Sequence, residues 1–96
     1  MNDRLFYVCQ CPVCEQGLCR VRVSTTEDKA IFGCVVCDEC DTTWTDPTLK
    51  ERFKQPSPEF PVCPKCDVQL WGEQSRWADE VDLCLLGWFS QSIAES

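Results

Sequence analysis

Residues 11–40 read CPVCEQGLCRVRVSTTEDKAIFGCVVCDEC, and the Cys-x-x-Cys units at the two ends of this stretch decide the fold. A Cys-x-x-Cys turn holds two thiols on one tight loop, at the separation that a tetrahedral Zn²⁺ site requires. Two such turns supply four ligands. We therefore predict that one structural Zn²⁺ ion is bound by Cys11, Cys14, Cys37 and Cys40.

The residues between the two units predict a β-hairpin. In residues 18–24, Cys19, Val21 and Val23 alternate with two arginines, which is the period of a half-buried strand. A polar segment over residues 25–29 is typical of a turn, and a return strand follows over residues 30–36. Because a hairpin brings its own ends together, closing this loop and binding the metal support each other.

The size of the chain favours a metal. A domain of 96 residues buries little apolar surface, so something besides the core should stabilise it. The N-terminal residues MNDRLFYV lack the basic start and apolar stretch of a secretory signal, so we expect a reducing, cytoplasmic location. There, ten cysteines favour metal binding over disulfides. No apolar run has the length of a membrane span.

A third unit, Cys63-Pro-Lys-Cys66, leaves open whether the chain binds a second metal ion. We predict Cys63 and Cys66 as metal ligands as well; the alternative is a pair of unmetallated core thiols. The chain has no histidine, so a second zinc needs further cysteines or a carboxylate. The unassigned cysteines are Cys9, Cys19, Cys34 and Cys84. The pattern around Cys19 and Cys84 is that of packing residues, which leaves Cys9 and Cys34 as the better candidates.

The remaining segments predict a small, metal-stabilised α+β fold. It consists of a zinc-ribbon hairpin over residues 1–55 and a short C-terminal α/β extension over residues 56–96, packed on the ribbon as one unit. Prolines at positions 56, 58 and 61 mark the boundary. One short helix is predicted over residues 47–54, after Asp46. Another is predicted over residues 79–86, because acids fill its first turn and Gly87 follows its end.

The charge of the chain bears on its partners. It has 16 acidic and 9 basic residues, a formal net charge of −7, and the excess of acids is largest in residues 57–96. Nucleic-acid binding draws much of its free energy from Lys and Arg side chains that neutralise phosphates. The composition therefore argues against nucleic acid and favours a basic protein as the partner.

From Cys11 to Trp44, the pattern CPVCEQGL, hairpin, CDECDTTW resembles the zinc-ribbon superfamily, in particular small bacterial single-ribbon proteins. The resemblance implies that the four cysteines bind the metal and that Trp44 packs on the hairpin. Residues 76–88 resemble the tail of uncharacterised ribbon proteins that are themselves similar to toxin-neutralising partners. This second resemblance implies an immunity or antitoxin role.

These observations together predict a non-catalytic zinc-binding module for protein–protein interaction. More specifically, we expect an immunity or antitoxin protein that binds and masks a basic toxin. Four thiolates leave no open metal position for a substrate, so we do not expect an enzyme. Tryptophan is favoured as an interface anchor, whereas Trp44 and Trp71 are expected in the core. The predicted partner-binding residues are Trp77, Asp79, Glu80, Asp82 and Trp88.

Two alternatives use other residues. Glu27 and Asp28, at the predicted hairpin tip, resemble the acidic tip of ribbons in transcript-cleavage elongation factors, which implies a transcription or nucleic-acid accessory role. Cys37 with Glu39, followed by the distant Cys63 and Cys66, resembles a zinc deaminase pattern, although the proline spacing before Cys63 and the short chain depart from it. The sequence does not set the oligomeric state.

Overall fold

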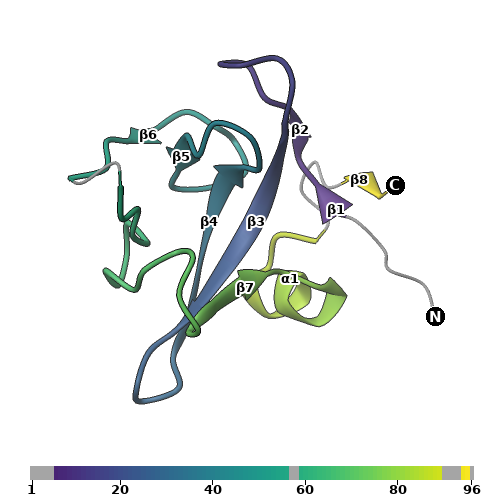
Figure 1. The fold of residues 1–96 in the computed structure, drawn as a ribbon. Coiled ribbons are helices and arrows are strands. Elements are labelled where there is room, and N and C mark those ends of the chain that lie inside the picture. Colours follow the sequence, from purple (N-terminus) through teal and green to yellow (C-terminus); the bar gives the residue numbers. More distant parts are fainter. Residues whose placement is uncertain (1–5, 57–58, 90–93, 96) are drawn as a thin grey trace.

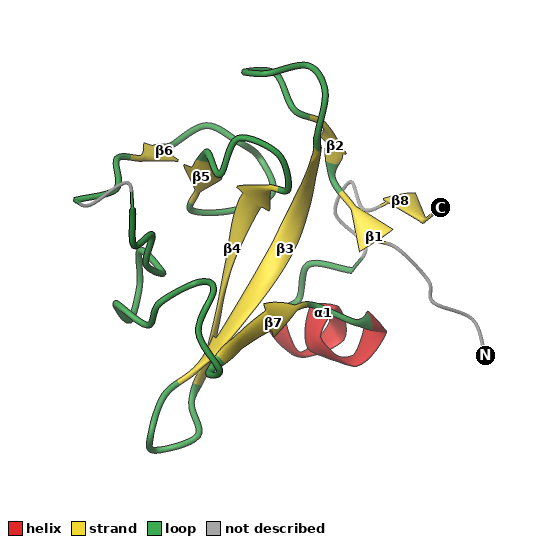
Figure 2. Cartoon of the chain, viewed as in Figure 1, coloured by secondary structure: helices red, strands yellow, loops and turns green. Residues whose placement is uncertain are grey.

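The computed structural model describes residues 6–56, 59–89 and 94–95 of the chain (Figure 1). The fold is mostly β, with a curled antiparallel sheet and one short helix (Figure 2). In chain order the elements are β1 (Phe6–Tyr7), β2 (Cys9–Gln10), β3 (Leu18–Thr25), β4 (Ile31–Cys37), β5 (Thr43–Trp44), β6 (Arg52–Phe53), β7 (Ser75–Trp77), α1 (Glu80–Leu86) and β8 (Ala94–Glu95).

The predicted hairpin is confirmed and forms the centre of the sheet. β3 and β4 pair in antiparallel register from Cys19 opposite Cys37 to Thr25 opposite Ile31. The sheet order is β2-β3-β4-β5-β6, and β7 also pairs with β3, farther along the strand than β2. β1 pairs with β8 in a separate two-stranded sheet. Because β7 joins β3, the C-terminal part of the chain shares a sheet with the metal-binding part.

Both faces of the hairpin are covered, because alternate residues of a strand point to opposite faces. On one face Val21, Val23 and Val35 pack with Leu83 of α1. On the other face Cys34 and Val36 pack in a second buried cluster, with Cys63 and Leu70. The expectation of a half-buried hairpin is therefore wrong, since residues 61–77 cover the face that was expected to be exposed to solvent.

The capped helix predicted at residues 79–86 is confirmed as α1. The Asp79 side chain accepts a hydrogen bond from the backbone N–H of Asp82, and the Asp82 side chain accepts one from the N–H of Asp79, which is a capping box. Gly87 closes the helix in the left-handed conformation, with φ 75°. A Cβ atom at Gly33 would lie 2.6 Å from the Leu86 side chain, so the glycine in β4 lets the end of α1 approach the sheet.

The helix predicted over residues 47–54 is wrong. Asp46 accepts a hydrogen bond from the backbone N–H of Thr48 at 2.8 Å, which a helix N-cap and an isolated turn have in common. Leu49 then adopts a left-handed φ of 58°, which ends the turn. Strand pairing between Trp44 and Arg52 replaces helical hydrogen bonds in this segment.

No helix in the described part of the chain combines the length and the apolar character needed to cross a membrane.

Candidate metal centre

Four cysteines meet at one end of the central hairpin. Cys11 and Cys14 lie on the loop between β2 and β3, Cys37 is the last residue of β4, and Cys40 lies in the turn before β5. Within residues 6–56, 59–89 and 94–95, they are the one group of three or more His, Cys, Asp or Glu side chains placed to hold a metal ion, and their ligand atoms all lie within 4.8 Å of one another. Such a group can hold a metal ion.

The spacing of the sulfur atoms suits a tetrahedral ion. Zinc–sulfur bonds of about 2.3 Å place the corners of a tetrahedron about 3.8 Å apart. The Cys11 and Cys40 sulfurs are 3.8 Å apart, and the Cys14 and Cys37 sulfurs are 3.6 Å apart. Two of the six sulfur–sulfur distances therefore match the edge of a zinc tetrathiolate, and all six are within 4.8 Å.

Backbone N–H groups point at the first sulfur of each Cys-x-x-Cys turn. The Cys11 sulfur accepts from the Val13 N–H at 3.4 Å, and the Cys37 sulfur accepts from the N–H groups of Glu39 and Cys40 at 3.3 and 3.4 Å. Such donors favour the thiolate, which is the form that binds metal. The residue after each turn has a left-handed backbone, with φ 58° at Glu15 and 61° at Asp41.

The thiol pKa values show how the cluster shares charge. Burial by itself raises the pKa of Cys11, but N–H donation from Cys14 and Val13, with hydrogen bonds from Cys37 and Cys40, lowers it to about 6. Burial raises the pKa of Cys37 to about 12. Cys11 therefore ionises readily, whereas Cys37 does not. A bound divalent cation would favour the thiolate form of both.

Gly17, which the zinc-ribbon resemblance implied as a residue that shapes the cysteine turns, supports the site through its lack of a side chain. A Cβ atom there would lie 2.7 Å from the Cys37 sulfur and 2.7 Å from Oδ1 of Asp38. Asp38 Oδ1 also accepts a hydrogen bond from the Leu18 N–H at 2.9 Å, which fastens the second turn to the start of β3. The position of Gly17, between a Cys-x-x-Cys turn and a strand, was the signal that could have indicated this close approach.

Gly17→Ala is expected to weaken metal binding about tenfold or more, because the added methyl group pushes against a ligand sulfur and its supporting turn. Competition with a chromophoric zinc chelator measures the affinity. Gly72→Ala is the matched control, since a Cβ atom at Gly72 would meet its nearest neighbour at 3.4 Å, an ordinary contact. Equal affinities for the two variants would contradict this role.

The third Cys-x-x-Cys unit lies apart from the four-cysteine group. Cys63 is fully buried in the second cluster with Cys34, and Cys66 packs against that cluster. A hydrogen bond from Cys34 is the main cause that lowers the pKa of Cys63 to about 5. The deaminase-like alternative required Cys37 beside Cys63 and Cys66, and the structure does not bring these three together in one group.

The four unassigned cysteines have distinct surroundings. Cys19 is fully buried, as its packing role predicted, and Cys9 lies opposite it in the β2–β3 pair. Cys84 is exposed on α1, so its predicted packing role is wrong. Cys34 is fully buried and is the one of the four that packs in a cluster with Cys63.

The predicted partner-binding residues have structural contacts of their own. Asp79 and Asp82 cap α1, and Asp82 also forms a 2.5 Å ion pair with Arg76. Glu80 is exposed in the first turn of α1. Trp88 packs over Gly33, where its ring would come within 2.9 Å of an added Cβ atom.

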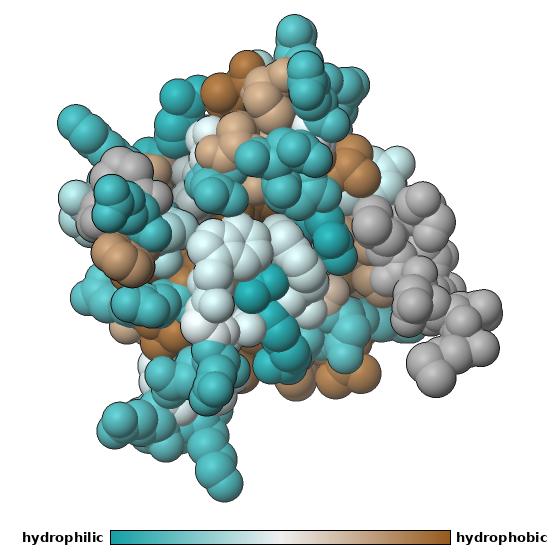
Figure 3. Space-filling model, viewed as in Figure 1, coloured by the Kyte–Doolittle hydropathy of each residue, from teal (hydrophilic) through white to brown (hydrophobic). Residues whose placement is uncertain are grey.

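Tryptophans and arginines interleave on the covered side of the hairpin. The Trp77 ring packs edge-on against Trp71, with 5.5 Å between centroids, and the Arg20 guanidinium lies 4.4 Å from the Trp77 ring. The space-filling view shows side chains of intermediate hydropathy near the middle of the face that it presents (Figure 3). Trp44 is buried, as predicted, but Trp71 is 46% exposed, so its assignment to the core is wrong.

Comparison with family models, curated proteins and solved structures gives no match to this chain. The four-cysteine cluster is compatible with a zinc ribbon. We therefore infer the function from the geometry of the site itself.

Proposed function

We propose that this chain is a non-catalytic zinc-binding module, in which the four-cysteine group holds a structural Zn²⁺ ion and the acidic surface binds a basic protein. The observation that carries the proposal is the group of four cysteine sulfurs that lie within 4.8 Å of one another, with two pairs at the edge length of a zinc tetrathiolate. Four thiolates complete the tetrahedron, so the ion has no open position for a substrate. Tetrahedral all-sulfur sites also suit iron, which a visible absorption spectrum would reveal.

The position of the site supports a structural role. It joins the loop before β3, the end of β4 and the turn before β5, which are three segments that a small core holds weakly. Cys11 and Cys37 are also members of the main buried cluster, so the ligands and the core depend on the same packing. Metal binding and folding are therefore coupled in this proposal.

The outer face of α1 supports the interaction role. Val81 and Leu85 are 64% and 69% exposed, four residues apart on one side of the helix, and Phe89 is exposed just beyond it. Acidic Asp79 and Glu80 flank this face at the helix start. An apolar strip beside acids complements a partner surface that carries an apolar side chain ringed by lysine or arginine. More specifically, we propose that the partner is a basic toxin, which this surface masks.

Leu85→Lys is expected to reduce partner binding about tenfold or more, because it puts a positive charge on the apolar strip. The measurement is affinity capture from cells that express the chain, followed by titration of the purified partner. Phe60→Lys is the matched control, because it makes the same charge change at a 60% exposed residue outside α1. A basic protein that binds the wild type and the control but not Leu85→Lys supports the proposal. Equal binding to all three contradicts the surface, and the absence of a basic partner contradicts the role.

A further inference from the structure

All three Cys-x-x-Cys turns have the same backbone conformation. The residue after the second cysteine is left-handed in each, with φ 58° at Glu15, 61° at Asp41 and 61° at Asp67. Each of these residues donates its N–H to the carbonyl of the first cysteine, at 3.0, 3.2 and 3.0 Å. A left-handed backbone is unfavourable for glutamate and aspartate, so its repetition at the third turn indicates the same use.

A backbone hydrogen bond made by the first cysteine is also repeated. The Cys63 N–H donates to the Val68 carbonyl at 2.8 Å, matching the 2.9 Å bond between the Cys37 N–H and the Thr42 carbonyl. A cysteine that only fills space in a core does not need this turn.

A third thiol reaches the turn from the hairpin. Cys34 of β4 is fully buried and packs in one cluster with Cys63, and Cys66 packs against that cluster. Cys9, the other candidate from the sequence, packs instead against the main cluster beside Cys11. The structure therefore places three thiols at the third turn, on the face of the hairpin opposite the main cluster.

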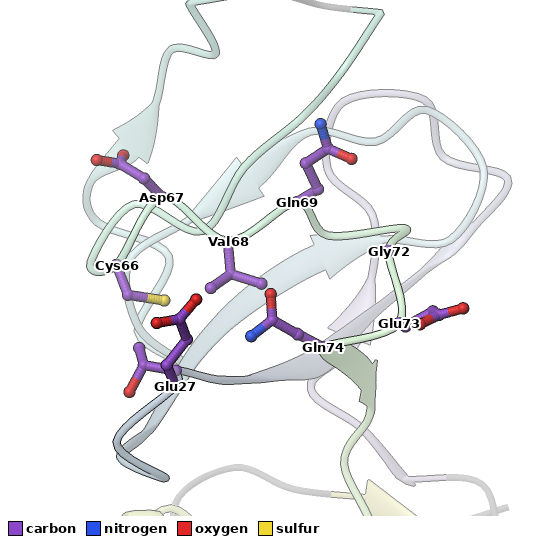
Figure 4. A pocket seen from close by; sticks show the side chains of 9 residues that line it. Glu27, Cys66, Asp67, Val68, Gln69, Gly72, Glu73 and Gln74 are labelled. Atoms are coloured by element: carbon purple, nitrogen blue, oxygen red, sulfur yellow. The ribbon is translucent and has the colours of Figure 1, made fainter.

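We propose that Cys34, Cys63 and Cys66 form a second Zn²⁺ site, whose fourth position is open to solvent. Cys66 lines a groove with Glu27, Asp67 and Val68, and Figure 4 shows its thiol pointing into this groove on the side of Glu27. As they stand, these three sulfurs are not one of the groups of described side chains that could hold a metal ion. Binding therefore requires a side-chain rotation, for which the half-buried Cys66 has room in the groove. Three protein ligands with one open position form a more exchangeable site than the tetrathiolate.

Native mass spectrometry of the full chain loaded with Zn²⁺ tests this site. Two ions per chain are expected for the wild type, and one for Cys34→Ser and for Cys66→Ser. Because Cys34 is fully buried and its replacement could disturb folding, the half-buried Cys66 provides the second variant. Titration with a chelator should remove the ions in two steps from the wild type, and the weaker step should be missing from both variants.

Cys84→Ser is the matched control, since it removes an exposed thiol from α1 and should keep both ions. One ion in the wild type, unchanged in Cys34→Ser and Cys66→Ser, would overturn the second site and leave the four-cysteine site standing. A wild-type mass lower by two hydrogens, with Cys34 and Cys63 joined, would overturn it in favour of a disulfide. No bound ion in any chain would contradict the four-cysteine site as well.

Discussion

Cys37→Ser should abolish the native fold at 25 °C, even with zinc in excess. Structural zinc contributes on the order of 10 kcal/mol to the folding of small domains, which is comparable to the whole stability of a typical protein. Cys37 is fully buried, ends β4 and provides one of the four sulfurs. Its loss removes one ligand and leaves three thiols without the ion that would neutralise them.

Circular dichroism and the dispersion of amide resonances measure this loss. The variant should give the spectrum of an unfolded chain and show no cooperative unfolding transition. Cys84→Ser, which removes an exposed thiol far along the chain, should behave as the wild type does. A folded, cooperatively unfolding Cys37→Ser protein would refute the structural role of the metal.

Arg22→Met should lower the free energy of unfolding by about 3 kcal/mol. Arg22 is 8% exposed, and its guanidinium donates to the Leu70 carbonyl at 2.8 Å, to Ser75 Oγ at 3.1 Å and to the Ser75 carbonyl at 3.3 Å. It also lies 4.5 Å from the Trp71 ring and 4.7 Å from the Trp77 ring. Methionine keeps the aliphatic volume but leaves these acceptors without a donor, a loss only partly offset by removing a buried charge.

Urea denaturation of the zinc-loaded protein measures this change. Arg52→Met is the matched control, because Arg52 is exposed in the short strand β6 and its replacement should change the stability by less than about 0.5 kcal/mol. If both variants lose the same free energy, Arg22 does not fasten residues 70–77 to β3.

The contrast between Arg22 and Val21 shows what the sequence could predict. Alternation of apolar and polar residues correctly placed a strand at residues 18–24, because the period depends only on local geometry. The burial of Arg22 depends on residues about 50 positions away, Leu70 to Trp77, which fold over it. No local pattern contains that information, so the covered face was expected to be exposed.

The two predicted helices also differ in whether local residues alone decide the structure. At residues 79–86 the capping residues and the left-handed glycine are all local, and the helix was predicted within one residue of its observed start. Near Asp46 the same kind of capping signal fits an isolated turn equally well. Pairing of β5 with β6 decided between the two, and pairing depends on the rest of the sheet.

Some cysteine assignments could likewise be made from local spacing, and others could not. Spacing alone identified Cys11, Cys14, Cys37 and Cys40 as one set, because each turn is local and the hairpin between them closes the loop. Spacing left both Cys9 and Cys34 as candidates beside the third turn. The face of the hairpin distinguishes them, since Cys34 packs in the second buried cluster with Cys63 while Cys9 lies opposite Cys19.

Native mass spectrometry before and after metal removal tests whether a metal ion in the four-cysteine group holds the fold together. We expect the purified chain to carry at least one zinc ion in a compact, low-charge state. A strong chelator should convert it to a metal-free chain with the broad, high-charge distribution of an unfolded protein. A metal-free chain that keeps the compact distribution would show that the ion does not hold the fold together.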